Sequence, residues 1–180
     1  MNPVSLFATL AGFSVMLGGC SAEPASNTGS SREQIGIYDS RAIAIAFVGG
    51  EVFRETMDAV RAEFDEATGI GDEATLARIS TQMQERQKLL HAQGFSTASV
   101  DELLVHYSDG ISELLDEAGV AVLISKLHDE ALSKHPGTHR VDMTESLVDL
   151  ITADPKQRNA AMEILDQDPV PLESLEDHKD

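Results

Sequence analysis

The chain has 180 residues, which is enough for one domain with a hydrophobic core. Its 13 basic and 31 acidic residues give a net charge of -18. This balance disfavours nucleic-acid binding and contact with anionic lipid head groups, because both need clustered Lys and Arg. Such a balance favours a well-solvated acidic surface. With no Trp and 4% aromatic residues, the core must be aliphatic.

The chain begins with a short apolar segment that ends in small residues and the one cysteine. Residues 4–17 carry no charge and are fewer than the roughly 20 apolar residues that a membrane-spanning helix needs, so they predict a secretory signal. The end of the segment, Leu17-Gly18-Gly19-Cys20, resembles the lipobox of bacterial lipoproteins. That resemblance implies that residues 1–19 are a signal peptide, that Cys20 is the first mature residue, and that acyl chains such as palmitate anchor it. The alternative is an ordinary signal peptide with an incidental cysteine.

The residues after the cysteine predict the location and the tether. In the lipoprotein family a serine at the position of Ser21 is typical of the outer membrane. The resemblance therefore implies a bacterial cell-envelope protein, lipid-anchored in the outer membrane and facing the periplasm. Residues 20–34 are rich in Ser, Ala, Gly, Asn and Pro, which indicates a flexible tether. The lipid anchor alone would then contact the membrane.

The folded part of the chain is expected to begin with a strand. Alternating isoleucines predict a short strand at residues 35–39. Residues 40–48 fit either an extension of that strand or a helix, because Ala and Ile alternate while Ile43 and Phe47 have helical spacing. The glycine pair at residues 49–50 ends the segment.

Residues 51–93 predict an antiparallel helical hairpin. Two amphipathic helices, at residues 51–68 and 72–93, are joined by Gly69-Ile70-Gly71, and their apolar residues have the spacing of a coiled-coil seam. The seam residues are Phe53, Met57, Val60, Phe64, Leu76, Ile79, Met83 and Leu90. Each stripe is narrow, so we expect a partner helix or a second chain to cover it. These residues are expected to form the core of the hairpin, and the alternative is an adaptable apolar surface for unfolded clients, which an oligomer could combine with that core.

Another helix and two strands are expected next. Ser99-Val100-Asp101-Glu102 matches a capping box, in which Ser99 and Glu102 each bind the other's amide, and predicts a helix to about residue 118. Residues 120–124 are an apolar run typical of a buried strand, and residues 139–143 predict a short strand.

The C-terminal part is expected to be a helix and a tail. A helix is expected through residue 151, and Asp154-Pro155 is a helix start that predicts a C-terminal helix at residues 154–166. Residues 167–180 contain two prolines and five acidic residues against one basic residue, which predicts a disordered acidic tail.

Three segments, in this order, resemble the Skp (OmpH-like) family of periplasmic chaperones. Residues 35–40 are similar to the opening strand of that family, residues 119–125 to its second strand, and residues 141–148 to the Asp-Ile-Thr element that leads into its last helix. Here that element reads Asp-Met-Thr. The resemblance assigns residues 35–153 to one Skp/OmpH-like domain.

The resemblance implies a fold and an assembly. The fold class is α+β and mostly helical, with a small β-sheet body and the hairpin of residues 51–93 projecting from it. It also implies a homotrimer that holds unfolded outer-membrane proteins without ATP. The hairpin arms here have about 20 residues each and reach roughly 30 Å, which is shorter than in the well-studied members.

The sequence contains no constellation typical of catalysis, so we expect no enzyme activity and no cofactor. His128, His135 and His139 lie close in sequence, but the Pro-Gly pair at residues 136–137 prevents helical metal-ligand spacing, and we expect surface histidines and no metal site. Asp39 and Arg41 at the end of the first strand favour a salt bridge or cap over a reactive site.

These observations lead to one expected function and two alternatives. We expect a lipid-anchored holdase-type chaperone whose partners are unfolded or other envelope proteins. The second hypothesis is a structural or scaffold lipoprotein that oligomerises through its hairpins. The third is an enzyme or metal-binding protein that uses the loop at residues 128–142.

Overall fold

The structure is a computed structural model that describes residues 34–176. The predicted signal peptide, Cys20, Ser21 and the tether up to residue 33 lie outside the described residues. Within residues 34–176, every helix is too short or too polar to cross a membrane.

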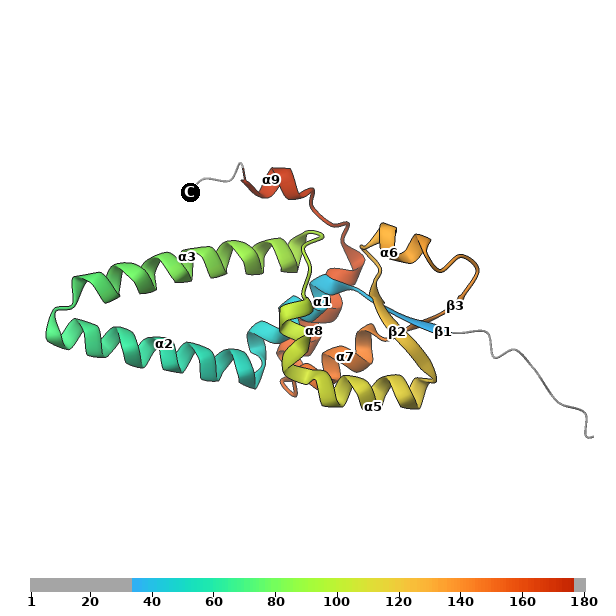
Figure 1. Cartoon of the computed structure of the whole chain (residues 1–180), viewed down its shortest axis with the longest axis horizontal. Helices are drawn as coiled ribbons and strands as arrows, with labels where there is room; N and C mark the ends of the chain where they lie inside the picture. Colours follow the sequence, from blue (N-terminus) through green and yellow to red (C-terminus); the bar gives the residue numbers. More distant parts are fainter. Residues whose placement is uncertain (1–33, 177–180) are drawn as a thin grey trace, which may run out of the picture. The chain divides into compact units, whose positions relative to one another are not determined.

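The sheet of the described domain is small and parallel (Figure 1). It consists of β1 (Gln34–Tyr38), β2 (Val120–Ser125) and β3 (His139–Asp142), in the order β2-β1-β3. The strand β1 is central, and its residue Ile35 is fully buried. The three strands occur where the sequence predicts them, and most of the remaining described residues are helical, which agrees with an α+β fold.

The ambiguous segment after β1 is a helix, α1 (Ser40–Gly49). The carboxylate of Asp39 accepts a hydrogen bond from the amide of Arg41 and caps the first turn. Most of the surface of α1 is buried, so the helix needs no polar face. Small and large apolar residues can therefore alternate along it. Its residues Ile43 and Phe47 belong to the hydrophobic core.

The two long helices are α2 (Glu51–Ile70) and α3 (Glu73–Phe95), and Figure 1 shows them side by side. Gly71 lies between them with φ 72°, a left-handed conformation that glycine adopts without strain. Asp72 then caps α3 by accepting from the amide of Thr75. We call these two helices the α2–α3 pair. Each is about two residues longer than predicted at its C-terminal end.

The helix predicted at residues 99–118 is divided, and the capping-box prediction is wrong. The segment contains α4 (Asp101–Leu104), the 3-10 helix η1 (Val105–Tyr107) and α5 (Ser108–Ala118). The Glu102 carboxylate accepts from the side-chain amide of Gln93, while the hydroxyl of Ser99 accepts from the amide of Asp101. Gln93 is fully buried and needs a partner, so it takes the carboxylate that a capping box would use.

The remaining helices follow β2 in the chain, and those within residues 144–166 complete the core. They are α6 (Asp129–Ser133), α7 (Thr144–Ile151), α8 (Pro155–Glu163), the 3-10 helix η2 (Ile164–Asp166) and α9 (Leu172–Glu176). Ala161 and Ile164 lie in the same core cluster as Ile43 and Phe47, and the side chain of Gln157 donates to the carbonyl of Ile45. The predicted boundary at residue 153 therefore passes through the core rather than between two parts.

The described residues of the predicted disordered tail are ordered by contacts with α3. Residues 172–176 form α9, and the amide of Val170 donates to the carbonyl of Phe95 at 2.8 Å. Phe95 ends α3, so its carbonyl has no partner further along that helix and accepts from the tail instead.

Candidate functional site

A cavity of about 480 Å³ lies between α2 and α3, next to the end of α1. Four of the predicted contact residues line it: Phe53 and Met57 from α2, and Met83 and Leu90 from α3. All four side chains are half-buried in the single chain. We call this space the α2–α3 cavity.

The other four predicted contact residues lie outside the α2–α3 cavity. Val60 and Leu76 are half-buried, and Ile79 is buried at 4% exposure. Phe64 is 45% exposed and lies nearer the turn between the helices. The structure thus brings together the half of the predicted set that is nearest the core.

The base of the cavity is fixed by aromatic contacts. The ring of Phe53 meets the ring of Phe47 edge to face, with centroids 5.9 Å apart, and Phe47 is 1% exposed in the core. The guanidinium of Arg86 lies 5.5 Å from the centre of the Phe53 ring, which is a cation–π distance. Phe53 therefore has little freedom, whereas Met57 and Met83 are unbranched and adapt to what they contact.

Polar side chains complete the lining, and sequence periodicity alone did not find them. Ser80 and Gln87 of α3 lie one helical turn before and after Met83, which was the available signal, and Gln84 directly follows Met83. Val48 comes from α1, and only the tertiary packing places it there. Arg86, which interrupts the apolar stripe of α3 in the sequence, is accounted for by its contact with Phe53.

The helices around the cavity are acidic. Residues 51–95 contain nine Asp or Glu and five Lys or Arg. An ion pair between Glu63 and Arg78 joins the two helices, and both side chains are nearly half exposed. Exposed pairs of this kind contribute little to stability, so the apolar contacts mainly hold the pair together.

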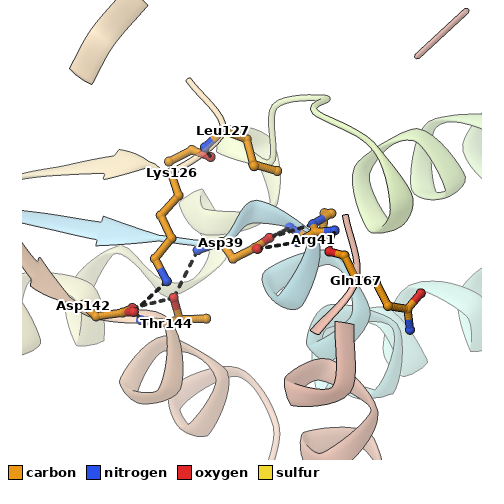
Figure 2. Close-up of polar contacts among 8 residues, drawn as sticks. Asp39, Arg41, Lys126, Leu127, Asp142, Thr144 and Gln167 are labelled. Carbon is orange, nitrogen blue, oxygen red and sulfur yellow. Dashed lines mark hydrogen bonds and ion pairs between the residues drawn. The ribbon is translucent and has the colours of Figure 1, made fainter. Parts of the chain in front are cut away.

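The carboxyl ends of the three strands are joined by a polar network (Figure 2). The amide of Asp39, after β1, donates to the Thr144 hydroxyl at 3.1 Å, and that hydroxyl donates to Asp142 at 2.7 Å. Lys126, after β2, donates to the other oxygen of Asp142 at 2.6 Å. Partial burial acts to raise the pKa of Asp142, but the hydrogen bonds from Lys126 and Thr144 outweigh it and hold the pKa below its usual value.

The predicted role of Asp39 and Arg41 as a salt bridge and cap is confirmed. Their side chains are 7% and 4% exposed, and Arg41 donates to both carboxylate oxygens of Asp39, at 3.1 and 2.7 Å. In this buried bidentate pair, both carboxylate oxygens of Asp39 accept hydrogen bonds from the guanidinium of Arg41. The pair therefore holds α1 in place and offers no free group for chemistry.

The histidine segment contains no metal-binding geometry within residues 34–176. His128 and His139 are exposed and His135 is half-buried. No group of three His, Cys, Asp or Glu side chains in the described part of the chain is placed to hold a metal ion. The nearby Asp142 is already occupied by Lys126 and Thr144.

Comparisons with protein-family models, with curated proteins and with solved structures give no match for this chain. The functional argument therefore rests on the residues and on their geometry. Of the features described so far, the α2–α3 cavity is the one that combines an apolar surface with an opening to solvent.

Proposed function

We propose that this protein is a lipid-anchored cell-envelope protein in which the α2–α3 pair, an antiparallel hairpin resembling that of the Skp family, binds apolar segments of unfolded envelope proteins. Its role is that of a holdase-type chaperone. The observation that supports the proposal most is that Phe53, Met57, Met83 and Leu90 leave an apolar cavity between the helices of one chain. A structural core would fill that space.

The lining of the cavity suits varied apolar side chains. Two methionines offer a surface that repacks around different shapes, as promiscuous protein-binding surfaces do. Burying one Leu or Phe side chain of a client contributes roughly 1.5–3 kcal/mol. Ser80, Gln84 and Gln87 at the rim supply donors and acceptors for a client backbone. Contacts of this strength are individually weak, so a client dissociates without an energy source.

The apolar surface continues beyond the cavity towards the turn between the helices. Phe64 is 45% exposed and Ile70 is 75% exposed. Scattered exposed apolar residues are common on proteins, but these two lie on the same helical pair as the cavity. Phe64, two helical turns from Met57 on the same face of α2, extends the surface along which an unfolded segment would lie, whereas Ile70 is exposed at the end of that helix.

The acidic outer faces and the anchor fit the same role. Net charge of one sign favours solubility, which protects a chain with exposed apolar residues from non-specific aggregation. The lipid on Cys20 would hold the protein at the membrane that envelope proteins must reach. The location and the anchor belong to the proposal and rest on the lipobox resemblance.

A homotrimer is part of the proposal because the Skp resemblance implies one. The half-buried Val60 and Leu76 are where neighbouring subunits would cover the stripes. The mass in solution of residues 21–180 tests this assembly. Three chains per particle support it, and a monomer at all concentrations contradicts it.

The second candidate function is a scaffold lipoprotein that oligomerises through its hairpins and binds no unfolded client. It is favoured by the contacts of Phe53 with Phe47 and Arg86, which fix one wall of the cavity as in a structural interface. A scaffold would have a folded, specific partner. Cross-linking to one such protein, with no protection of denatured proteins, would favour the scaffold.

An aggregation assay distinguishes the two functions. A denatured outer-membrane protein is diluted into buffer with residues 21–180, and light scattering is recorded. The wild type at about stoichiometric amounts should suppress scattering, and Met57→Glu combined with Met83→Glu should abolish the effect. Val105→Glu is the matched control, because Val105 is 71% exposed on η1, outside the α2–α3 pair. Absence of suppression by the wild type contradicts the chaperone proposal.

A further inference from the structure

A second cavity, of about 520 Å³, lies at the carboxyl ends of β1 and β2. Its walls are the last residues of these strands, the segment at residues 97–101, and α6 with the residues after it. In open parallel sheets, ligands bind in the crevice outside the carboxyl ends of the strands. The volume is in the range of small-molecule sites. We call this space the strand-end cavity, and it is separate from the α2–α3 cavity.

One wall of the strand-end cavity carries a buried hydroxyl without a partner. Ser40, the first residue of α1, is 2% exposed, and its Oγ makes no hydrogen bond within residues 34–176. A buried polar group without a partner costs about 1–3 kcal/mol, so such groups are rare in folded proteins unless something binds them. Its place in the cavity wall makes a ligand the natural partner.

Two further oxygen-bearing groups line the same cavity. Tyr38 ends β1, and burial, followed by the negative charge of Asp101, raises its pKa, so the phenol stays neutral. Asp101, an exposed residue at the start of α4, lines the same cavity. Asp101 takes part in none of the ion pairs formed among residues 34–176.

We propose that the strand-end cavity binds the ammonium group of an aliphatic primary amine. An ammonium has three donors and no acceptor. Three oxygen-bearing side chains line the cavity, the carboxylate of Asp101 and the neutral hydroxyls of Ser40 and Tyr38. The aliphatic stem of the ligand would contact Val100, Val122 and Ile124, which line the same space. A net charge of -18 attracts cations to the protein and repels anions.

The basic residues of the lining do not favour an anion instead. Lys134 pairs with Glu130 at 3.1 Å, and both side chains are mostly exposed, so its charge is already compensated. A nucleophilic serine is also not supported, because Ser40 makes no hydrogen bond to His128 or His135, although all three line the cavity. The arrangement is therefore one for binding.

The amine has two possible sources, a free metabolite or a lysine side chain of another protein. Calorimetric titration of residues 21–180 separates them with two probes, 1,4-diaminobutane and Nα-acetyl-lysine amide. The core cluster lies within residues 38–164, so this part of the chain contains it whole. n-Butanol and butyrate serve as uncharged and anionic probes of similar size. Saturable binding of one equivalent of either amine, and of neither control probe, is the expected result.

Three variants connect the binding to this cavity. Asp101→Asn should weaken amine binding about tenfold, because it removes the charged acceptor. Ser40→Ala should weaken it about threefold, because it removes one neutral acceptor. Glu113→Gln, at an exposed position of α5 outside the cavity, changes the net charge equally and should leave the affinity unchanged.

Several outcomes would overturn the proposal. One is that the wild type shows no saturable amine binding, and another is that it binds n-butanol equally well. A third is that Glu113→Gln and Asp101→Asn weaken amine binding equally, which would show only a general attraction of cations. If Asp101→Asn does not fold, the NMR chemical shifts of the Tyr38 ring in the wild type report amine binding in this cavity instead. They should move on adding 1,4-diaminobutane and stay unchanged with butyrate, and the absence of a shift with the amine refutes the proposal.

Discussion

The guanidinium of Arg41 donates a hydrogen bond of 2.7 Å to the backbone carbonyl of Gln167, which lies 126 residues further along the chain. The other donors of Arg41 meet the carboxylate of Asp39. One buried side chain therefore joins the start of α1 to the end of η2. This contact makes the C-terminal segment part of the domain.

Replacing Arg41 should destabilise the domain strongly. Arg41→Met leaves the Asp39 carboxylate buried without its partner, and breaking a buried pair in this way costs about 3–5 kcal/mol. Urea unfolding monitored by circular dichroism measures the loss. Lys134→Met is the matched control, since it breaks an exposed pair and should change the free energy of unfolding by about 0.5 kcal/mol or less. A loss of the same small size for Arg41→Met would contradict the buried pair.

Two helical glycines should respond oppositely to alanine. A Cβ at Gly110, in α5, would lie 2.6 Å from the nearest side-chain atom of Leu150 in α7, whereas a Cβ at Gly69, in α2, meets nothing within 4 Å. Gly69→Ala should therefore stabilise the protein by up to about 1 kcal/mol through helix propensity. Gly110→Ala should destabilise it by about 1 kcal/mol through overpacking. Thermal unfolding compares them, and equal stabilisation by both would disprove the close approach of α5 to α7.

The C-terminal helix should be needed for stability. Ile164 is 4% exposed in the core cluster, so Ile164→Ala should cost about 2–4 kcal/mol. Leu172→Ala is the control, because Leu172 is 46% exposed and its replacement should change the free energy of unfolding little. A chain that ends at residue 153 should not unfold cooperatively in urea. Cooperative unfolding of that shorter chain would show that the predicted domain boundary at residue 153 is right.

Asp142 should contribute stability that depends on pH. Its pKa is lower in the folded protein than in the unfolded chain, where it is about 3.9, so the folded state favours the ionised form. The contribution is present above the unfolded pKa and is lost as the pH falls through the lowered folded value. The side chain is 56% exposed, so solvent screening limits the effect to less than about 1 kcal/mol.

Comparison of the wild type with Asp142→Asn measures this contribution. The wild type should be more stable in urea at neutral pH, and the difference should disappear below the pKa of the folded state. Asparagine keeps an acceptor for Thr144, so the comparison isolates the charge. A difference that persists unchanged in strong acid would assign it to packing.

The long helices and the strands were predictable because their signals are local. The seam of residues 51–93 shows helical spacing over several turns, and the strand at residues 120–124 is a short apolar run with a glycine before it. Each depends only on neighbouring residues. The turn between the helices was equally visible, since Gly71 takes a left-handed conformation there.

Features that depend on contacts distant in sequence were not predictable in this way. The capping box at Ser99 failed because Gln93, buried by tertiary packing, takes the Glu102 carboxylate. The boundary at residue 153 was drawn from the local helix start at Asp154-Pro155, and that signal does not reveal that Ala161 lies in one core cluster with residues far earlier in the chain. The α2–α3 cavity was anticipated as a stripe, but its opening, and the place of Arg86 over Phe53, required the packing of three helices.

Methionine oxidation tests the central claim about the α2–α3 pair most directly. Residues 21–180 are oxidised with and without a bound denatured outer-membrane protein, and the oxidation rates are followed by mass spectrometry. Met57 and Met83 should be oxidised several-fold more slowly in the complex. Met143, which is 4% exposed in the core, should be slow in both states and serves as the internal reference. Formation of a complex with no change in the rates of Met57 and Met83 would contradict the claim that this cavity binds the client.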